Sequence, residues 1–159
     1  MDISYSVKPI GHVRSDDGGF RLELDPAYRP AMVGLEGFGY LNILWWFSGC
    51  DDTRSRENLI ERSPYARGPE CLGVFATRSP MRPNPVALSC AAVTHLDPKA
   101  GVIGLSYIDA EDGSPLLDLK PYTPSLDRVE APPLPAWCAH WPRDVESSGD
   151  FPWEDEFSF

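Results

Sequence analysis

The stretch LGVFATRSPMRPNPVALS, residues 72–89, decides how this chain is expected to fold. Its apolar start, residues 72–76, is typical of a buried strand, and residues 86–93 form a second apolar run. The loop between them contains three prolines, which fix φ and keep the preceding residues extended. The sequence therefore predicts two strands joined by a stiff loop that presents Arg78 and Arg82.

This loop has two interpretations. A stiff loop with two guanidinium groups is preorganised to hold an anionic or planar ligand. Alternatively, it is a rigid surface turn whose arginines pair with nearby carboxylates, an arrangement that contributes little to stability. Spacing alone leaves both interpretations open.

Composition favours one turn-rich globular protein. The chain has 159 residues, enough for one core, with 17 prolines, 13 glycines and 42% hydrophobic residues. No apolar run approaches membrane-spanning length, and the first residues lack a signal-peptide pattern. We therefore expect a cytoplasmic protein with no membrane partner.

The cysteines do not indicate a metal site. The four cysteines are far apart, without a C-x-x-C pair, and the three histidines are scattered. We expect no metal, and we expect Cys71 and Cys90 to be small core residues, because both lie in strand-like surroundings.

Charge is unevenly distributed along the chain. The net charge of −10 argues against non-specific nucleic-acid binding, which needs many cationic contacts to phosphate. Residues 144–159 contain six acids and no base, whereas residues 54–82 contain six arginines and three glutamates. A basic face beside an acidic tail remains compatible with one anionic substrate.

Short strands account for most of the chain. Residues 20–24 alternate between apolar and charged side chains, which predicts a half-exposed strand. Residues 40–47 are almost wholly apolar, which predicts a central strand buried on both faces. Trp45 and Trp46 in this strand are either core residues or a surface for base stacking.

The remaining segments complete the pattern of an all-β barrel. Residues 51–67 are expected to be mostly loop with a helical turn at 56–60, and residues 86–95 and 102–108 to form a hairpin. Asp112-Gly113 marks a tight turn before a short strand. Many short strands with close turn signals predict a small β-barrel with short helical turns.

The organisation changes near residue 129. Residues 1–128 are predicted to form the barrel domain, and residues 129–159 a proline-rich spacer with an acidic, aromatic tail. A short helix is predicted at 136–140. The tail is either disordered or a strap over an apolar groove.

Three ordered blocks resemble one known family. Residues 73–89, GVFATRSPMRPNPVALS, are similar to the G-V-F-A-T-R-S-x-x-R-P-N-P-I-G-x-S signature of the TrmO family of S-adenosylmethionine-dependent tRNA methyltransferases. Residues 34–47 and 108–122 resemble its other two blocks. The resemblance covers roughly residues 7–125 and implies a small homodimeric β-barrel.

The resemblance also implies a donor site. No G-x-G-x-x-G follows a strand, so a Rossmann-type donor site is not expected. By resemblance to the family, the residues expected to bind S-adenosyl-L-methionine are Ser48, Gly49, Arg78, Leu88, Ile108, Asp109, Ala110 and Glu111. Asp109 is the expected acceptor for a ribose hydroxyl or an amino group.

The chain departs from the family pattern in three ways. Ser48 and Gly49 stand where the family usually has His-Gln, and the Pro-Arg-Gln segment after the first strand is missing. The additional C-terminal domain of longer members is also not expected here. The first two departures change how the donor is expected to be held, and the third removes a region thought to help with tRNA.

The last block supplies candidate catalytic residues. Asp118, Lys120 and Tyr122 match the family's D-[IL]-K-P-Y block, and strand alternation places them on one face. Methyl transfer to an adenine N6 needs a group that accepts a proton. Alternatively, the three residues form a structural salt bridge with a tyrosine cap. Arg82 and Asn84 are the candidate substrate-binding residues, although Asn84 also suits a turn cap.

These observations support three hypotheses. The leading one is a methyltransferase acting on the adenine 3′ of the tRNA anticodon, in its threonylcarbamoyl form, with tRNA as partner. A second retains the donor but replaces tRNA by a small molecule or a protein. A third is a non-catalytic S-adenosylmethionine-binding module.

Overall fold

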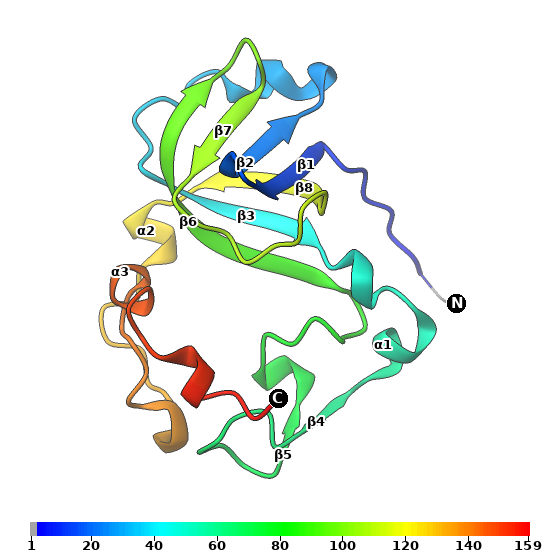
Figure 1. Ribbon diagram of the computed structural model, residues 1–159, viewed down its shortest axis with the longest axis vertical. Helices are drawn as coiled ribbons and strands as arrows, with labels where there is room; N and C mark the ends of the chain where they lie inside the picture. Colours follow the sequence, from blue (N-terminus) through cyan, green and yellow to red (C-terminus); the bar gives the residue numbers. More distant parts are fainter. Residues whose placement is uncertain (1–2) are drawn as a thin grey trace.

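The computed structural model describes residues 3–159, and its main feature is a closed barrel of antiparallel strands. The order around the barrel is β1-β2-β7-β6-β3-β8 (Figure 1). The strands are Gly11–Asp16 (β1), Gly19–Leu24 (β2), Tyr40–Trp46 (β3), Val86–Asp97 (β6), Val102–Leu105 (β7) and Pro115–Pro121 (β8). The all-β barrel predicted from the sequence is confirmed.

Alternating side chains fill the barrel. In β3, Leu41, Ile43 and Trp45 are buried, whereas the residues between them are partly exposed. The prediction that β3 is buried on both faces is therefore wrong, because only its inner face packs in the core. Trp45 is a core residue and donates its indole N–H to the Ser89 hydroxyl at 3.0 Å. The alternation predicted for β2 is confirmed, since Leu22 is buried inside.

The barrel closes along an uneven seam. β1 pairs with β2 along its whole length, but it pairs with β8 only at Gly11 and His12. A Cβ at Gly11 would overlap the Glu23 carbonyl oxygen of the neighbouring strand. Glycine therefore allows the two backbones to approach where β1 begins.

A small second sheet lies beyond the barrel (Figure 1). It pairs β4 (Ile60–Arg62) with β5 (Cys71–Gly73). The predicted buried strand at 72–76 is wrong, because the chain leaves β5 at Gly73 and enters a 3-10 helix, Val74–Ala76. Phe75 in that helix is 85% exposed. Cys71 is exposed rather than in the core, and Cys90 is only partly buried.

Short helices occupy several connections. α1 spans Thr53–Glu57, so the helical turn lies earlier than the predicted 56–60, and Asp52 caps it by accepting the Ser55 N–H. Other 3-10 helices span Pro26–Met32 and Ser48–Cys50. Among residues 3–159, no helix has the length and apolar character needed to cross a membrane.

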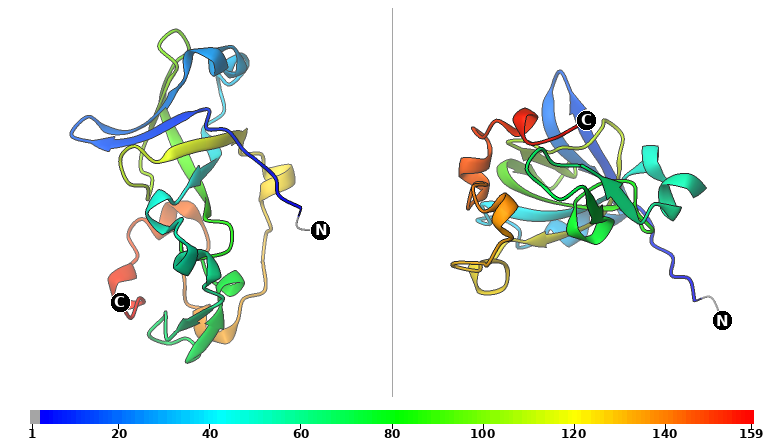
Figure 2. Two further views of the ribbon diagram at one scale, coloured as in Figure 1. Left: turned by 90° about the vertical axis from the view of Figure 1, so that its right-hand side faces the viewer. Right: turned by 90° about the horizontal axis from the view of Figure 1, so that it is seen from below.

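The C-terminal strap, residues 129–159, lies along one side of the molecule (Figures 1 and 2). It runs from the barrel to the small sheet, returns to the barrel near residue 146 and ends beside the small sheet. α2 (Pro124–Asp127) precedes it, and it contains a 3-10 helix at Ala136–Cys138, α3 (Val145–Ser148) and a 3-10 helix at Trp153–Asp155. Of the two alternatives for the tail, the structure shows a packed strap.

Candidate active site

The signature loop, residues 77–85, is fixed by its own polar side chains. The buried Thr77 hydroxyl donates to the Val74 carbonyl at 3.0 Å and accepts the Ser79 N–H at 3.2 Å. The Ser79 hydroxyl donates to Glu61 at 2.6 Å. These contacts act together with the prolines to hold the loop in the conformation that the structure shows.

The Arg82 side chain binds main-chain carbonyls of the signature loop and of the residues just before it. One amino group of its guanidinium donates to the Val74 carbonyl at 2.6 Å and to the Thr77 carbonyl at 2.7 Å. Asn84, in contrast, is exposed, and its carbonyl accepts the Val86 N–H at 2.7 Å. The substrate-binding role of both residues stays a prediction, with Asn84 the more accessible of the two.

Arg78 lies exposed beside the first part of β6. Its guanidinium donates to the Leu88 carbonyl at 2.9 Å, and it makes no ion pair within residues 3–159. Leu88 itself is 49% exposed and points out of the barrel. The loop arginines therefore pair with main-chain carbonyls, and Arg78 keeps donors that are available to a ligand.

The connection between β7 and β8 carries the next group of predicted residues. Ile108 is buried in the core, while the side chains of Asp109 and Glu111 are exposed. Within residues 3–159, neither carboxylate forms an ion pair. The connection therefore has an apolar anchor and two free carboxylates on either side of Ala110.

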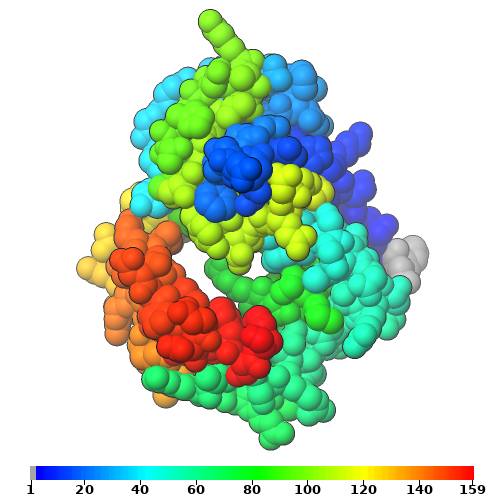
Figure 3. Space-filling view, in the orientation of Figure 1, coloured from blue at the N-terminus to red at the C-terminus, as the bar shows by residue number. Residues whose placement is uncertain are grey.

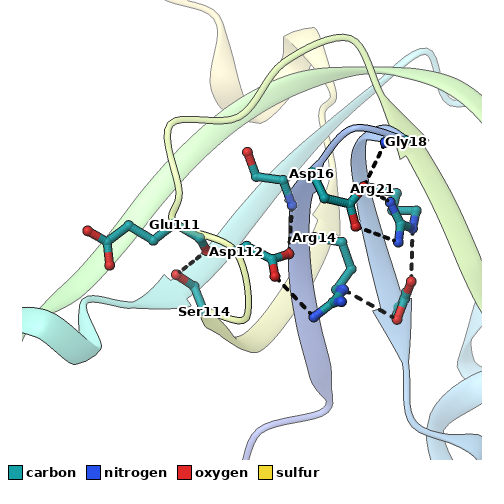
Figure 4. Close-up of polar contacts among 9 residues, drawn as sticks. Arg14, Asp16, Gly18, Arg21, Glu111, Asp112 and Ser114 are labelled. Atoms are coloured by element: carbon teal, nitrogen blue, oxygen red, sulfur yellow. Dashed lines mark hydrogen bonds and ion pairs between the residues drawn. The ribbon is translucent and has the colours of Figure 1, made fainter.

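Asp112 fastens this connection to the β1–β2 hairpin (Figure 4). Its carboxylate accepts the Ser15 N–H at 3.0 Å and lies 3.3 Å from the Arg14 guanidinium. The Ser114 hydroxyl donates to the Glu111 carbonyl at 2.8 Å. Asp112 begins the predicted tight turn, in which Gly113 has a φ of +82°. The turn is confirmed, and it holds the preceding residues in one conformation.

The end of β3 completes this part of the molecule. Ser48 and Gly49 are exposed in the 3-10 helix that follows β3, and the Phe47 N–H donates to the Pro85 carbonyl at 2.9 Å. Burial and the nearby charges of Asp52 and Glu111 raise the pKa of the neighbouring Cys50 thiol. The end of β3, the signature loop and the β7–β8 connection therefore meet at one end of the barrel.

The outer face of the barrel links this region to the predicted catalytic residues. Leu44 of β3 is paired with Leu88 of β6 on one side and with Asp118 of β8 on the other. Leu88 and Asp118 are therefore two strand spacings apart, about 10 Å, on the same face. Sequence alternation did predict a shared face for Asp118 and Lys120, but not their position relative to Leu88.

Asp118, Lys120 and Tyr122 form a loose surface group. The Lys120 ammonium lies 2.8 Å from the Asp118 carboxylate, with side-chain exposures of 65% and 49%. The hydrogen bond that Lys120 donates to Asp118 raises the pKa of Lys120, so this lysine is protonated at neutral pH. The Tyr122 ring packs beside Tyr40, with centroids 6.3 Å apart. Both interpretations of this group, catalytic and structural, fit these contacts.

A deep opening separates the barrel from the strap. In Figure 3 it is bounded by the yellow-green β7–β8 connection, the green segment leading into β6 and the orange and red strap. Hollows of about 290 and 370 Å³ lie elsewhere on the barrel, and neither is lined by Arg78 or Leu88. Asp118 lines the larger of these two hollows.

Trp46 is on the outer face of β3 and is already engaged. Its indole N–H donates to Asp51 at 3.0 Å, and the Arg56 guanidinium lies 5.5 Å from the centre of its ring. Arg56 also donates to the Pro83 carbonyl at 3.2 Å, which ties α1 to the signature loop. Base stacking on Trp46 would therefore have to displace Arg56.

Sequence reasoning missed Tyr65 and the residues around it. Tyr65 stacks on Trp137, and His140 lies 2.7 Å from the buried carboxylate of Glu156. His140 and the indole of Trp141 keep the pKa of Glu156 below its usual range. The spacing of Trp137 and Trp141, one helical turn apart, was the one sequence signal for a cluster here.

The acidic and cysteine side chains do not group into a metal site. Within residues 3–159, no cluster of three or more His, Cys, Asp or Glu residues has the geometry to hold a metal ion.

The fold defines a β-barrel protein with a filled interior, and the candidate site lies outside the barrel, where loops meet at one end. The model of the tRNA-methyltransferase O N-terminal domain matches residues 7–128. The chain belongs to this family, as the signature predicted.

Relatives with known names support the assignment. A tRNA (adenine(37)-N6)-methyltransferase from Escherichia coli (strain K12) is 36% identical over 123 residues, covering 75% of this chain and 51% of that protein. An S-adenosyl-L-methionine-binding protein from Archaeoglobus fulgidus is 31% identical over 137 residues, covering 77% of this chain and 93% of that protein.

A solved structure agrees with the fold. A crystal structure of TrmO from P. aeruginosa matches with a TM-score of 0.66 at 31% identity, covering 86% of this chain and 62% of that chain. This chain thus spans less than two thirds of the solved TrmO chain and about half of the E. coli protein.

Proposed function

We propose that this chain is an S-adenosylmethionine-dependent methyltransferase that acts on N6 of the adenine next to the tRNA anticodon, in its threonylcarbamoyl form. The observation that carries the proposal is that the signature loop and the β7–β8 connection lie at the same end of the barrel, beside the end of β3. Membership of the tRNA-methyltransferase O family supports the same activity.

The residues at this end of the barrel fit the donor chemically. Arg78 has free N–H donors for the methionyl carboxylate, and Leu88 offers exposed apolar surface to the adenine. The free carboxylates of Asp109 and Glu111 suit the ribose hydroxyls and the amino group. Ser48 and Gly49 lie beside them, and this chain has no imidazole there.

The donor would supply an activated methyl group, and the chain must align the acceptor and remove a proton. Lys120 is protonated at neutral pH and cannot take up that proton. Asp118 can, since one of its oxygens pairs with Lys120 and the other is free. Tyr122 would then orient the acceptor base, while Asn84, and Arg82 as far as its loop contacts allow, would contact the RNA.

Methyl transfer to RNA tests this proposal. The full chain is incubated with S-adenosylmethionine labelled in the methyl group and bulk tRNA from cells that lack the protein. We expect incorporation that depends on the threonylcarbamoyl group, and a loss of about 10²-fold or more for Asp118→Asn, the usual contribution of a general base. Absence of labelled tRNA would contradict the tRNA assignment.

A second candidate keeps the donor and changes the role. The chain carries a net charge of −10, which opposes RNA binding, and the A. fulgidus relative is named for binding S-adenosyl-L-methionine alone. A small-molecule or protein methyltransferase, or a non-catalytic binding module, therefore remains the alternative. Donor binding without methyl transfer to tRNA would favour it.

The chain is further proposed to form a cytoplasmic homodimer. Leu59, Ile60 and Phe75 expose apolar surface around the small sheet, at 58%, 52% and 85%. Light scattering after size-exclusion chromatography distinguishes a monomer of 17.7 kDa from a dimer. A mass equal to one chain at micromolar concentration would contradict the dimer.

A further inference from the structure

Asn42 is a polar residue on the outer face of β3. Its two neighbours in the strand are buried, so its own side chain points out of the barrel. In the register of the sheet it lies opposite Lys120 of β8 on one side and Cys90 of β6 on the other. Side chains in such opposite positions have Cβ atoms about 4.5–5.5 Å apart. Asn42 is therefore a direct neighbour of Lys120 and of its partner Asp118.

Asp127 holds the Asn42 amide in one orientation. It comes from α2, which lies against β3 here (Figure 1). One of its carboxylate oxygens accepts the Asn42 Nδ2–H at 2.9 Å, and the other accepts the Thr123 main-chain N–H at 2.7 Å. An ionised carboxylate has acceptors only, so it must face the amide nitrogen rather than the amide oxygen. The Asn42 amide cannot turn over without losing this contact.

The rest of the Asn42 amide is left for a ligand. An asparagine side chain has two N–H donors and one oxygen acceptor, and Asp127 takes one of the donors. Within residues 3–159, the oxygen has no hydrogen-bond partner and is not fully buried. Lys120 contacts Asp118 at 2.8 Å, and its side chain is 65% exposed. The outer face therefore presents an oriented donor and acceptor beside an ammonium group.

This set of groups matches the threonylcarbamoyl substituent of the proposed acceptor. The substituent contains a urea, in which a C=O stands beside an N–H, and a threonine carboxylate. A primary amide pairs with a urea through two hydrogen bonds that run in opposite directions, and an ammonium pairs with a carboxylate. An unmodified adenine has neither the urea nor the carboxylate. It therefore cannot make these contacts.

We propose that Asn42 is a specificity-determining residue that binds the urea of the threonylcarbamoyl group, while Lys120 binds its carboxylate. Asp127 is the positioning residue for Asn42. The inference rests on the proposed function, which takes this substituent as part of the acceptor. Recognition through one amide and one ammonium does not need the broad basic surface that non-specific RNA binding requires and that a net charge of −10 opposes.

Two stem–loop RNAs test the proposal. They are identical except that one carries N6-threonylcarbamoyladenosine next to the anticodon and the other carries adenosine. In fluorescence anisotropy with the full chain, we expect a Kd at least tenfold lower for the modified RNA. Asn42→Ala should raise this Kd about three- to tenfold and leave the Kd for the plain RNA unchanged. In methyl transfer, KM for the modified RNA should rise while kcat at saturation stays constant.

Asp127→Ala tests the positioning role. It should raise the Kd for the modified RNA in the same direction, and it should add little in the Asn42→Ala background, because Asp127 acts through Asn42. Asp17→Ala is the matched control, since it removes the same charge from an exposed turn. It should affect the two RNAs equally. If Asp127→Ala also affects them equally, its role is only structural and the positioning role is wrong.

Nuclear magnetic resonance gives a result that does not depend on any variant. The side-chain NH₂ signals of Asn42 in the wild-type chain should shift when the modified RNA is added, and not when the plain RNA is added. Equal shifts with both RNAs would contradict a contact with the urea. Far-UV circular dichroism confirms that each variant used for Kd is folded.

The possible results separate this inference from the proposed function. If the chain methylates tRNA, but Asn42→Ala leaves the ratio of the two Kd values unchanged, the role of Asn42 is refuted and the methyltransferase assignment stands. If the preference for the modified RNA depends on Asn42 but no methyl group is transferred, the recognition role stands and the assignment falls. Equal binding of both RNAs by the wild type refutes the role of Asn42 whatever the activity.

Discussion

Asp112 is predicted to brace the β7–β8 connection, and removing its side chain should cost stability that can be worked out from its contacts. Asp112→Ala loses the acceptor of the Ser15 N–H, 3.0 Å away, and a partner of Arg14, 3.3 Å away. The hydrogen bond contributes about 1 kcal/mol, and the exposed ion pair about 0.2–1 kcal/mol. We therefore expect the free energy of unfolding to fall by about 1–2 kcal/mol.

Graded substitutions separate the two contributions. Asp112→Asn keeps an oxygen that can accept the Ser15 N–H and loses only the charge, so it should cost at most about 1 kcal/mol. Asp17→Ala changes the net charge equally, and Asp17 is an exposed turn residue without an ion pair or side-chain hydrogen bond among the described residues. Urea unfolding measures all three variants. If Asp112→Ala is no less stable than Asp17→Ala, the bracing role is refuted.

Three further outcomes follow from contacts in the barrel and the loop. Gly11→Ala should lower the free energy of unfolding by about 1–3 kcal/mol in urea, because its Cβ meets a strand backbone, whereas Gly39→Ala, with open space, should be near neutral. Hydrogen bonds from Arg21 and Gly18 lower the pKa of Asp16 to about 2. Ionised Asp16 therefore stabilises the folded state above about pH 4, and this stabilisation is lost as pH falls toward 2. Arg21→Gln should return the pKa of Asp16, measured by carboxyl NMR, toward its ordinary value. Arg82→Ala should lower the midpoint of urea unfolding, since two main-chain carbonyls lose their donor; an unchanged midpoint would leave Arg82 free for substrate.

The barrel was predictable because its strands follow simple alternation. β2 and β6 lie where apolar periodicity indicates strands, and proline and glycine mark the turns between them. The strand predicted at residues 72–76 was wrong after Gly73. Five apolar residues do not reveal whether the chain continues there as a strand or forms a 3-10 helix. Short apolar runs are ambiguous in this way.

The candidate site was predictable only in part. Local spacing indicated a rigid loop at 77–85, but it could not show that Arg82 faces two carbonyls of its own loop, because carbonyl directions depend on the folded backbone. The contact of Tyr65 with Phe157 joins positions far apart in the sequence. A single sequence contains no signal for such a contact. The packing of the strap against Tyr65 was therefore visible only in the structure.

The short seam between β1 and β8 sets a condition on synthesis by the ribosome. The first strand has its second neighbour only at Leu116 and Pro115, near the end of the family domain. A nascent chain therefore cannot close the barrel until residue 116 has been translated, and the β1–β2 hairpin must wait with both edges unpaired until β7 and then β8 are made. Unpaired strand edges pair with other chains or bind chaperones. Expression at a lower temperature is therefore expected to raise the yield of folded protein.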